Sequence, residues 1–247
     1  MILRTLKWAA SALLALVILA VLFIAIFGWN WLRAPLEKKV LEQTGRALQI
    51  KGDLNVALGW PWPRVEANGV TFANPAWAAQ AHMLTADQVA FSIHLPQLLA
   101  QNLVMTDLHL VQPLVFLERG ADGRKTWLLD PNQQDDSAGV LIDRLTLDRG
   151  VVGYDDPAGK TSIRAELSTV APGSGANGDL GVNFSAKGEF KGLALVAKGV
   201  GDSVLALRDE DTPYGLKVDA TVDKTRIQAD GNITSLVKFS AIDMQLA

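Results

Sequence analysis

The 247-residue sequence contains no cysteine and only three histidines. The absence of cysteine excludes disulfide bonds and cysteine-ligated zinc sites. Neither sign of charge is in large excess, because 23 Lys and Arg residues stand against 26 Asp and Glu residues. The chain therefore lacks the basic surplus on which nucleic-acid binding depends, and we expect no nucleic-acid partner. Its 49% of hydrophobic residues also exclude a disordered chain.

The signatures of common enzyme sites are missing too. Neither Gly-x-Ser-x-Gly nor His-Glu-x-x-His occurs. Residues 173–178 match the glycine-rich dinucleotide signature, but Pro172 precedes them and a strand pattern follows, so a flexible loop is predicted. His94 and His109 can share a metal only if their strands pair, and solvated histidines are the expectation. We expect a protein that is not an enzyme, with no catalytic residue, metal or cofactor.

A long apolar run opens the chain. Residues 8–27 carry no charge, and a helix of this length spans about 30 Å, the thickness of a bilayer core. Basic residues precede the run, so the positive-inside rule places the N-terminus in the cytoplasm. We predict that residues 1–33 hold a cytoplasmic N-terminus and an uncleaved single-pass anchor, with Trp29 and Trp31 at the far membrane interface and the remaining chain outside.

The next segment has the spacing of a short amphipathic helix. Over residues 34–46, Pro35 is suited to start a helix and Gly45 to end it. Apolar residues such as Leu36 and Val40 recur every four positions, with charged residues turned away from them. The helix is expected either to lie on the membrane or to close the end of the following sheet.

After residue 46 the apolar period changes from 3.6 to 2, which indicates strands. Residues 48–58 predict one strand or a hairpin, kinked near Gly52 and Asp53, and the prolines of residues 60–63 predict a rigid turn. Residues 65–73, interrupted at Gly69, and the alternating runs up to Leu117 predict further strands. The inward-facing candidates in this first half are Leu48, Ile50, Leu54, Val56, Leu58, Val89, Phe91, Ile93 and Leu95.

The second half repeats the alternation with smaller side chains. Residues 131–139 are almost free of apolar side chains and predict a linker or exposed loop, and residues 140–247 continue the strand pattern. Most connections are too short for crossover helices, so a mainly β fold with a largely antiparallel sheet is expected. Glycine-rich strands specify register weakly, so Ala194, Ala197 and Ala220 are left open to either face.

Several segments, in this order, resemble the amino-terminal region of the AsmA family of Gram-negative envelope proteins. The similarity extends over residues 1–130. In the remainder of the chain, only the alternating strand pattern is similar. The segments that carry it are Thr44-Gly45-Arg46, the turn Ile50-Lys51-Gly52-Asp53-Leu54, Pro61 to Pro63, Val65 to Val70, Asn74-Pro75, the strand pair from Leu103 to Leu117, and Arg124-Lys125-Thr126-Trp127.

This resemblance implies an inner-membrane protein whose periplasmic part is a curled sheet with an apolar groove, similar to chorein-type proteins that move phospholipids. Residues 47–130 would then form an amino-terminal groove region that residues 140–247 continue. Family members are usually longer, and the alternating pattern still runs at Ala247, so a fragment of a longer chain or a short member is expected.

Phospholipid binding and transfer between inner and outer membrane is the expected function, with the nine inward candidates contacting acyl chains. Expected partners are phospholipid, the inner membrane, and outer-membrane or periplasmic proteins. The alternative fold, a closed β-sandwich, implies a membrane-tethered scaffold that binds polypeptide and assists outer-membrane protein assembly or secretion. A membrane-bound hydrolase, a third alternative, would depend on His94 or His109.

Overall fold

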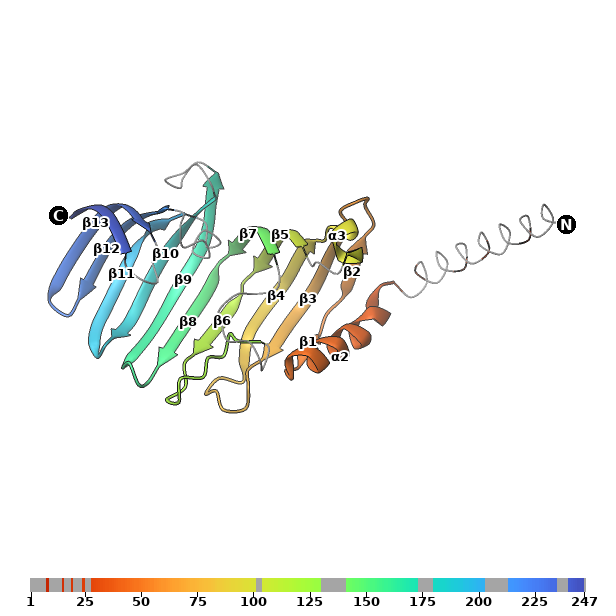
Figure 1. Cartoon of the computed structure of the whole chain (residues 1–247), viewed down its shortest axis with the longest axis horizontal. Coiled ribbons are helices and arrows are strands. Elements are labelled where there is room, and N and C mark those ends of the chain that lie inside the picture. The colour runs from red at the N-terminus through yellow and green to blue at the C-terminus, as the bar shows by residue number, and fades with distance from the viewer. Residues whose placement is uncertain are drawn as a thin grey trace.

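The structure is a computed structural model in which a single open sheet of 14 strands forms the body of the chain (Figure 1). It describes residues 28–100, 104–129, 141–172, 180–202, 213–234 and 240–246, together with four positions in the apolar run. The predicted linker at 131–139 and the glycine-rich loop at 173–178 lie outside the described residues.

Within residues 28–246, as far as the structure describes them, three short helical segments accompany the strands. They are η1 (Asn30–Leu32), α2 (Arg33–Thr44) and α3 (Leu95–Leu99). The strands are β1 (Leu48–Ile50), β2 (Leu54–Ala57), β3 (Arg64–Ala73), β4 (His82–Ser92), β5 (Val104–Val111), β6 (Leu114–Glu118), β7 (Leu141–Asp148), β8 (Gly150–Asp156), β9 (Thr161–Pro172), β10 (Leu180–Phe190), β11 (Leu193–Gly201), β12 (Pro213–Val222), β13 (Thr225–Thr234) and β14 (Ser240–Leu246).

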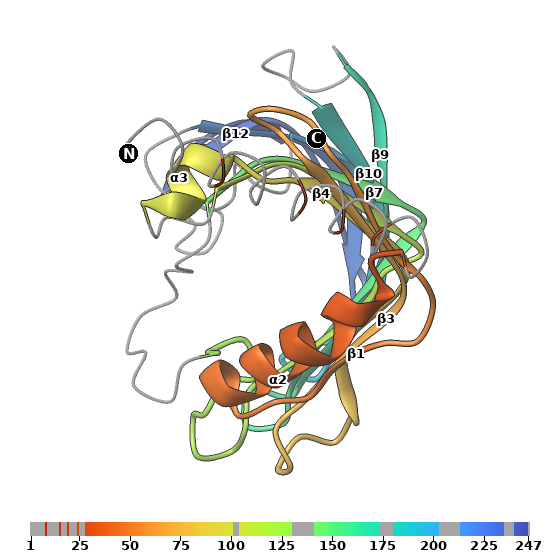
Figure 2. The same ribbon diagram turned by 90° about the vertical axis from the view of Figure 1, so that its right-hand side faces the viewer.

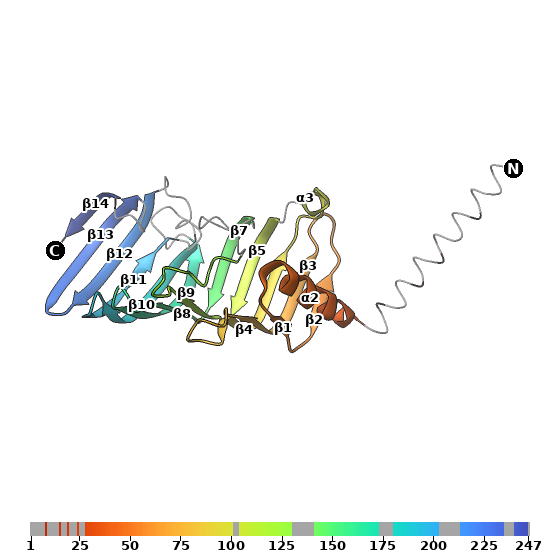
Figure 3. The same cartoon turned by 60° about the horizontal axis from the view of Figure 1, so that its bottom comes forward.

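Every described strand belongs to this one sheet, so the closed sandwich is wrong for the described strands. Viewed from the N-terminal end, the sheet bends into an arc that is open on one side (Figure 2). A turned view shows the strands arrayed along the length of the molecule, with β1 to β3 toward the N-terminal end and β14 at the other end (Figure 3). The mainly β fold is confirmed, and the sheet continues from the first half of the chain into the second without a break in its pairing.

The sheet is largely antiparallel, as expected, and departs from that order at one place. β5 pairs with β7, and β6 with β8, in parallel. β5 and β6 follow each other across Gln112-Pro113, and β7 and β8 across Arg149, so each pair continues one strand path through a residue with positive φ. The connection from Glu118 to Leu141 is long enough to return the chain to the same end of the sheet, which makes the two paths parallel.

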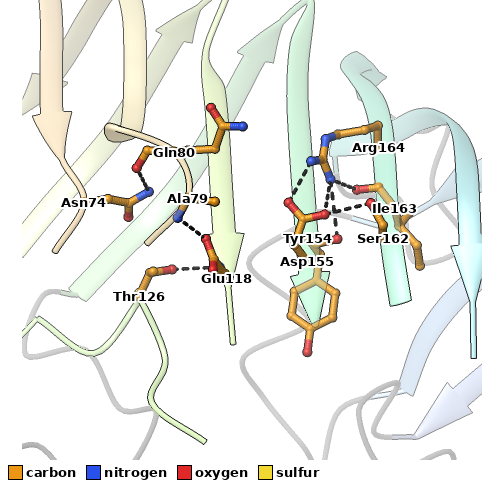
Figure 4. Close-up of polar contacts among 10 residues, drawn as sticks. All are labelled: Asn74, Ala79, Gln80, Glu118, Thr126, Tyr154, Asp155, Ser162, Ile163 and Arg164. Carbon is orange, nitrogen blue, oxygen red and sulfur yellow. Dashed lines mark hydrogen bonds and ion pairs between the residues drawn. The ribbon is translucent and has the colours of Figure 1, made fainter. Parts of the chain in front are cut away.

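The start of this crossover is held by a set of polar contacts. The Arg46 guanidinium donates to the carbonyl of Thr126 and, over 2.7 Å, to that of Leu128. The fully buried Thr126 accepts a 2.9 Å hydrogen bond from the Glu118 amide through its hydroxyl. The Glu118 carboxylate in turn accepts from the Ala79 amide over 2.7 Å (Figure 4). These contacts fasten the crossover to the β3–β4 loop and to the end of α2.

Helix α2 ends where the sequence indicates. Gly45 adopts a left-handed conformation, with φ of 67°, and its amide donates to the Leu41 carbonyl over 2.8 Å. The apolar face predicted for this helix, however, is not buried, because Leu36 and Leu41 remain 41% and 49% exposed. The helix is attached by other groups.

Polar side chains of η1 and α2 cap the free edge of the first strands. The Glu37 carboxylate accepts from the Ile50 amide over 2.8 Å, and Arg33 donates to the Gly52 carbonyl over 2.7 Å. The Asn30 amide oxygen accepts from the Leu54 amide over 2.8 Å. An open strand edge invites pairing with another chain, and this cover removes that possibility along residues 50–54. Of the two predicted roles, the structure shows closing of the sheet end.

The predicted kink at Gly52 and Asp53 is present, and it is not a hairpin. β1 and β2 both pair with β3, which runs through Gly69 at φ of 63°. Across the kink, the apolar positions of β3 change from odd to even numbers, yet they stay in one buried cluster. Its members are Ile50, Leu54, Ala67 and Val70, with Leu32, Leu48, Val65 and Val89 packed against it. The kink therefore keeps the apolar side chains of both halves together.

We predict that Gly52→Ala destabilises the protein by about 1–3 kcal/mol. A Cβ atom at this position would lie 2.8 Å from Asn68 Cβ and 2.9 Å from its carbonyl oxygen, so one of the paired strands must move. Urea denaturation of the detergent-solubilised chain measures the loss. The exposed neighbour Lys51→Ala serves as the control and should change stability by less than about 0.5 kcal/mol. Equal stabilities of the two variants would contradict the close approach.

Candidate functional site

An unbroken row of apolar side chains crosses the sheet. Residues directly opposite each other on paired strands point to the same face. Following the register from β1 to β13, each partner in one such row is apolar. The row, called here the long row, consists of Leu48, Phe72, Leu84, Val115, Val152, Ala165, Ala186, Ala197, Ala220 and Ile227.

Two further rows flank the long row in the second half of the sheet. One consists of Gly150, Leu167, Phe184, Gly199, Val218 and Ala229, and the other of Leu117, Tyr154, Ile163, Gly188, Leu195 and Val222. Side chains alternate along a strand, so the rows two positions apart share one face. A hollow of about 670 Å³ is lined by Phe184, Gly199, Val218 and Ala229 of these rows and by the neighbouring Asn183, Lys198, Val200, Lys217, Asp219, Gln228 and Asp230. We call this surface the apolar face.

The opposite face of the same strands is polar. Next to the long row lies a row of Val151, Glu166, Ser185, Lys198, Asp219 and Gln228. Lys217 and Asp230 form a cross-strand ion pair on this face at 3.0 Å. The sheet is thus amphipathic across its thickness, which the sequence left open for this half of the chain.

The difference in exposure indicates which face lies inside the arc. On β11, Ala197 of the long row is 9% exposed, whereas its neighbour Val196, on the other face, is 62% exposed. On β10, Ala186 is half-buried, whereas Ser185 and Lys187 are exposed. A curved sheet crowds the side chains of its concave side, so the apolar face is the inner one of the arc in Figure 2.

Ion pairs on the polar face shift the pKa values of two aspartates. Burial acts to raise the pKa of Asp155, but hydrogen bonds from Arg164 and Ser162 outweigh it and lower that pKa. Arg164 reaches both carboxylate oxygens, at 2.9 and 2.7 Å (Figure 4). A similar two-pronged contact from Arg226 lowers the pKa of Asp219 to about 2. Both carboxylates are therefore charged at neutral pH.

A second apolar hollow lies at the N-terminal end of the sheet. Its volume is about 530 Å³, and its walls come from the start of η1, the β2–β3 loop and the segment around α3. Four of the nine predicted inward residues line it, together with Trp29. They are Val56, Leu58, Ile93 and Leu95. We call this hollow the N-terminal pocket.

The other predicted inward residues occupy three settings. Leu48 belongs to the long row, while Ile50 and Leu54 are 6% and 2% exposed and form the buried cluster that supports the sheet. Val89 packs against that cluster, and Phe91 lies opposite Val65 on β3. The structure thus brings the predicted set into one region, with the most buried members acting as support. The second-half rows were missed, although their alternation is visible in the sequence.

The two histidines considered as ligands have separate contacts. The ring of His94 stacks at 4.2 Å from that of Trp62, and His109 Nδ1 lies 2.8 Å from the Thr146 hydroxyl. Within the described residues, no three His, Asp or Glu side chains gather as a metal site would require.

The predicted anchor is only partly described. Trp8 and Leu19 are 78% and 66% exposed, so these two residues of the run are not packed in a protein core. Among the residues that the structure describes, none belongs to a helix with the length and apolar character needed to cross a membrane. The anchor and the interfacial positions of Trp29 and Trp31 stay predictions.

The sequence matches the AsmA family model over residues 2–247. The chain belongs to the AsmA family. It is 26% identical over 270 residues to the AsmA family protein YhjG of Escherichia coli (strain K12), an alignment that covers 96% of this chain and 39% of that protein. The chain thus spans about two-fifths of the length of this relative. No solved structure matches it. The resemblance inferred from residues 1–130 is confirmed, and membership supports an envelope-associated role.

We predict that Arg226→Gln raises the pKa of Asp219 from about 2 toward the ordinary value near 3.9. A lowered native pKa stabilises the fold above the unfolded value, and this contribution is lost as pH falls through 3.9 toward 2. Carboxyl-carbon NMR of the detergent-solubilised chain gives the titration. Arg149→Gln, which removes a partner of Asp148 instead, is the control. An unmoved Asp219 pKa in the Arg226 variant would show that the pair has no electrostatic effect.

Proposed function

We propose that this AsmA family chain binds phospholipid acyl chains on its apolar face and carries lipid between the inner and outer membrane. The unbroken long row is the observation that supports this most. At about 4.8 Å per strand, the row extends roughly 40 Å along the sheet, which exceeds the thickness of a bilayer core.

Burial of acyl chains supplies the driving force for occupancy. Each methylene removed from water stabilises the complex by about 0.8 kcal/mol, without any need for a directional contact. From β9 to β12, the long row consists of Ala165, Ala186, Ala197 and Ala220. These small side chains present few obstacles to the sliding of an acyl chain. Movement along such a surface requires no catalytic residue.

The open side of the arc suits an amphiphile. Acyl chains would contact the concave apolar face, and headgroups would remain at the open side in water (Figure 2). The polar outer face, with ion pairs such as Arg226 with Asp219 and Lys217 with Asp230, keeps the convex side hydrated. This separation of an apolar concave face from a polar convex face would let the protein bind lipid while it remains in an aqueous compartment.

We place the source of lipid at the N-terminal pocket. Trp29 lines this pocket and is separated from the apolar run of residues 8–27 only by Gly28. An anchor in the inner membrane would hold the pocket next to a leaflet, with the body in the periplasm. Periplasmic or outer-membrane proteins would receive the lipid at the other end.

Site-specific photocrosslinking tests this function. A photoreactive amino acid at Leu195, on the apolar face, should crosslink to phospholipid in cells, whereas the same residue at Val196 should not. The two positions are adjacent, both are aliphatic, and they face opposite sides of β11. The comparison therefore isolates the face of the sheet from local hydrophobicity and from lipid held by the predicted anchor.

Equal crosslinking at the two positions would contradict the proposal. Crosslinks from Leu195 to polypeptide, with no lipid adduct, would support the scaffold function in its place. Leu195→Asp should in addition abolish lipid retention by the purified chain, with Val196→Asp retaining it, because only the former brings a charge to the surface that holds acyl chains.

A further inference from the structure

Large apolar side chains lie exposed in the β2–β3 loop and in the short helix α3, at the N-terminal end of the sheet. In the β2–β3 loop, Leu58 and Trp60 are 77% and 78% exposed, and Trp62 is 43% exposed. In α3, Leu98 and Leu99 are 42% and 81% exposed. We call these five residues the apolar rim.

Backbone hydrogen bonds hold the β2–β3 loop and the start of α3 side by side. The Leu95 amide donates to the Pro61 carbonyl over 3.1 Å, and the Ile93 amide donates to the Pro63 carbonyl over 3.0 Å. Stacking of Trp62 on His94 adds a side-chain contact between the same segments. The rim is therefore a preformed surface, with prolines that restrict its backbone.

No charged residue occurs in residues 57–63 or 95–100. The exposed strands of the polar face differ sharply, since they carry Lys, Arg, Asp and Glu in cross-strand pairs. An exposed apolar surface of this composition marks an interaction site, and its neutrality offers nothing for a charged partner to recognise. Tryptophan with aliphatic neighbours is the composition that favours the membrane interface.

We propose that the apolar rim inserts into the interfacial layer of the same bilayer that receives residues 8–27. The apolar run ends at Phe27, and Trp29 lines one pocket together with Leu58, Trp60 and Leu95. The rim thus lies where the chain would leave the membrane. This inference rests on the proposed membrane attachment for the nearness of a bilayer, but it does not depend on lipid binding by the apolar face.

Insertion would give the sheet a second point of attachment. A single helix lets the body tilt and rotate, whereas apolar side chains set about 5–10 Å into the headgroup and acyl boundary would fix its orientation. The N-terminal pocket would then open into the leaflet, and an acyl chain could enter it without crossing water.

The absence of cysteine allows a direct test on the full chain. Leu99→Cys carries an environment-sensitive fluorophore, and the labelled protein is reconstituted in nanodiscs of phosphatidylethanolamine and phosphatidylglycerol. Quenching is measured with nitroxide-labelled lipid and with aqueous iodide. Val196→Cys, equally suited to labelling because it is 62% exposed, is the matched control on the polar face.

We expect the probe at position 99 to be quenched by the nitroxide lipid and protected from iodide, and the probe at position 196 to show the reverse. Adding Trp60→Asp and Leu98→Asp, both at exposed positions, should shift the emission of the position 99 probe to the red and abolish its lipid quenching. A position 99 probe that iodide quenches overturns the proposal. Protection from both quenchers overturns it too, since a protein would then cover the rim. Crosslinking at Leu195 reports on the lipid-binding function separately.

Discussion

Cross-strand register is the constraint on which the rest of this structure depends. A one-residue slip in any strand would exchange its two faces, and would bring Val196 and its polar neighbours into the row now occupied by Ala197. Because register is kept from β1 to β13, small individual preferences for burial add up to one apolar surface. The kink at Gly52 and Gly69 serves the same purpose. The apolar positions of β3 change there from odd to even numbers, and the kink keeps these side chains on one face of the sheet.

The two faces of the sheet differ in composition and in what covers them. Paired charges hydrate the convex face, while the concave face is left without a second sheet among the described strands. A soluble domain normally closes such a surface on itself, because exposed apolar area is unfavourable in water. This open apolar face is the feature on which the proposed binding of a ligand with long hydrocarbon chains is based. The capped edge at Asn30, Arg33 and Glu37 adds to this arrangement by holding the first strands against η1 and α2.

Local pattern predicted much of the fold. Alternation located the strands of the first half, Gly45 ended α2, and the kink followed from Gly52 and Asp53. Local pattern could not predict contacts between residues that are distant in the sequence. The hydrogen bonds from Arg46 to Thr126 and Leu128 join segments some eighty positions apart, and no spacing rule connects them. The parallel pairing of β5 with β7 was missed because short connections elsewhere favoured an antiparallel order.

The sequence by itself determined that this is a strand-rich chain with alternating apolar positions, an uncharged apolar run near its start, and the motif order of the AsmA family. Those properties depend on residues within a few positions of each other. Only the tertiary structure decided which alternating sets share a face, because glycine- and alanine-rich strands accept either orientation until their neighbours select one. It also decided that the apolar face lies inside the arc and that the β2–β3 loop and α3 form one apolar rim. The first depends on the curvature of the sheet, and the second on backbone hydrogen bonds between segments some thirty positions apart.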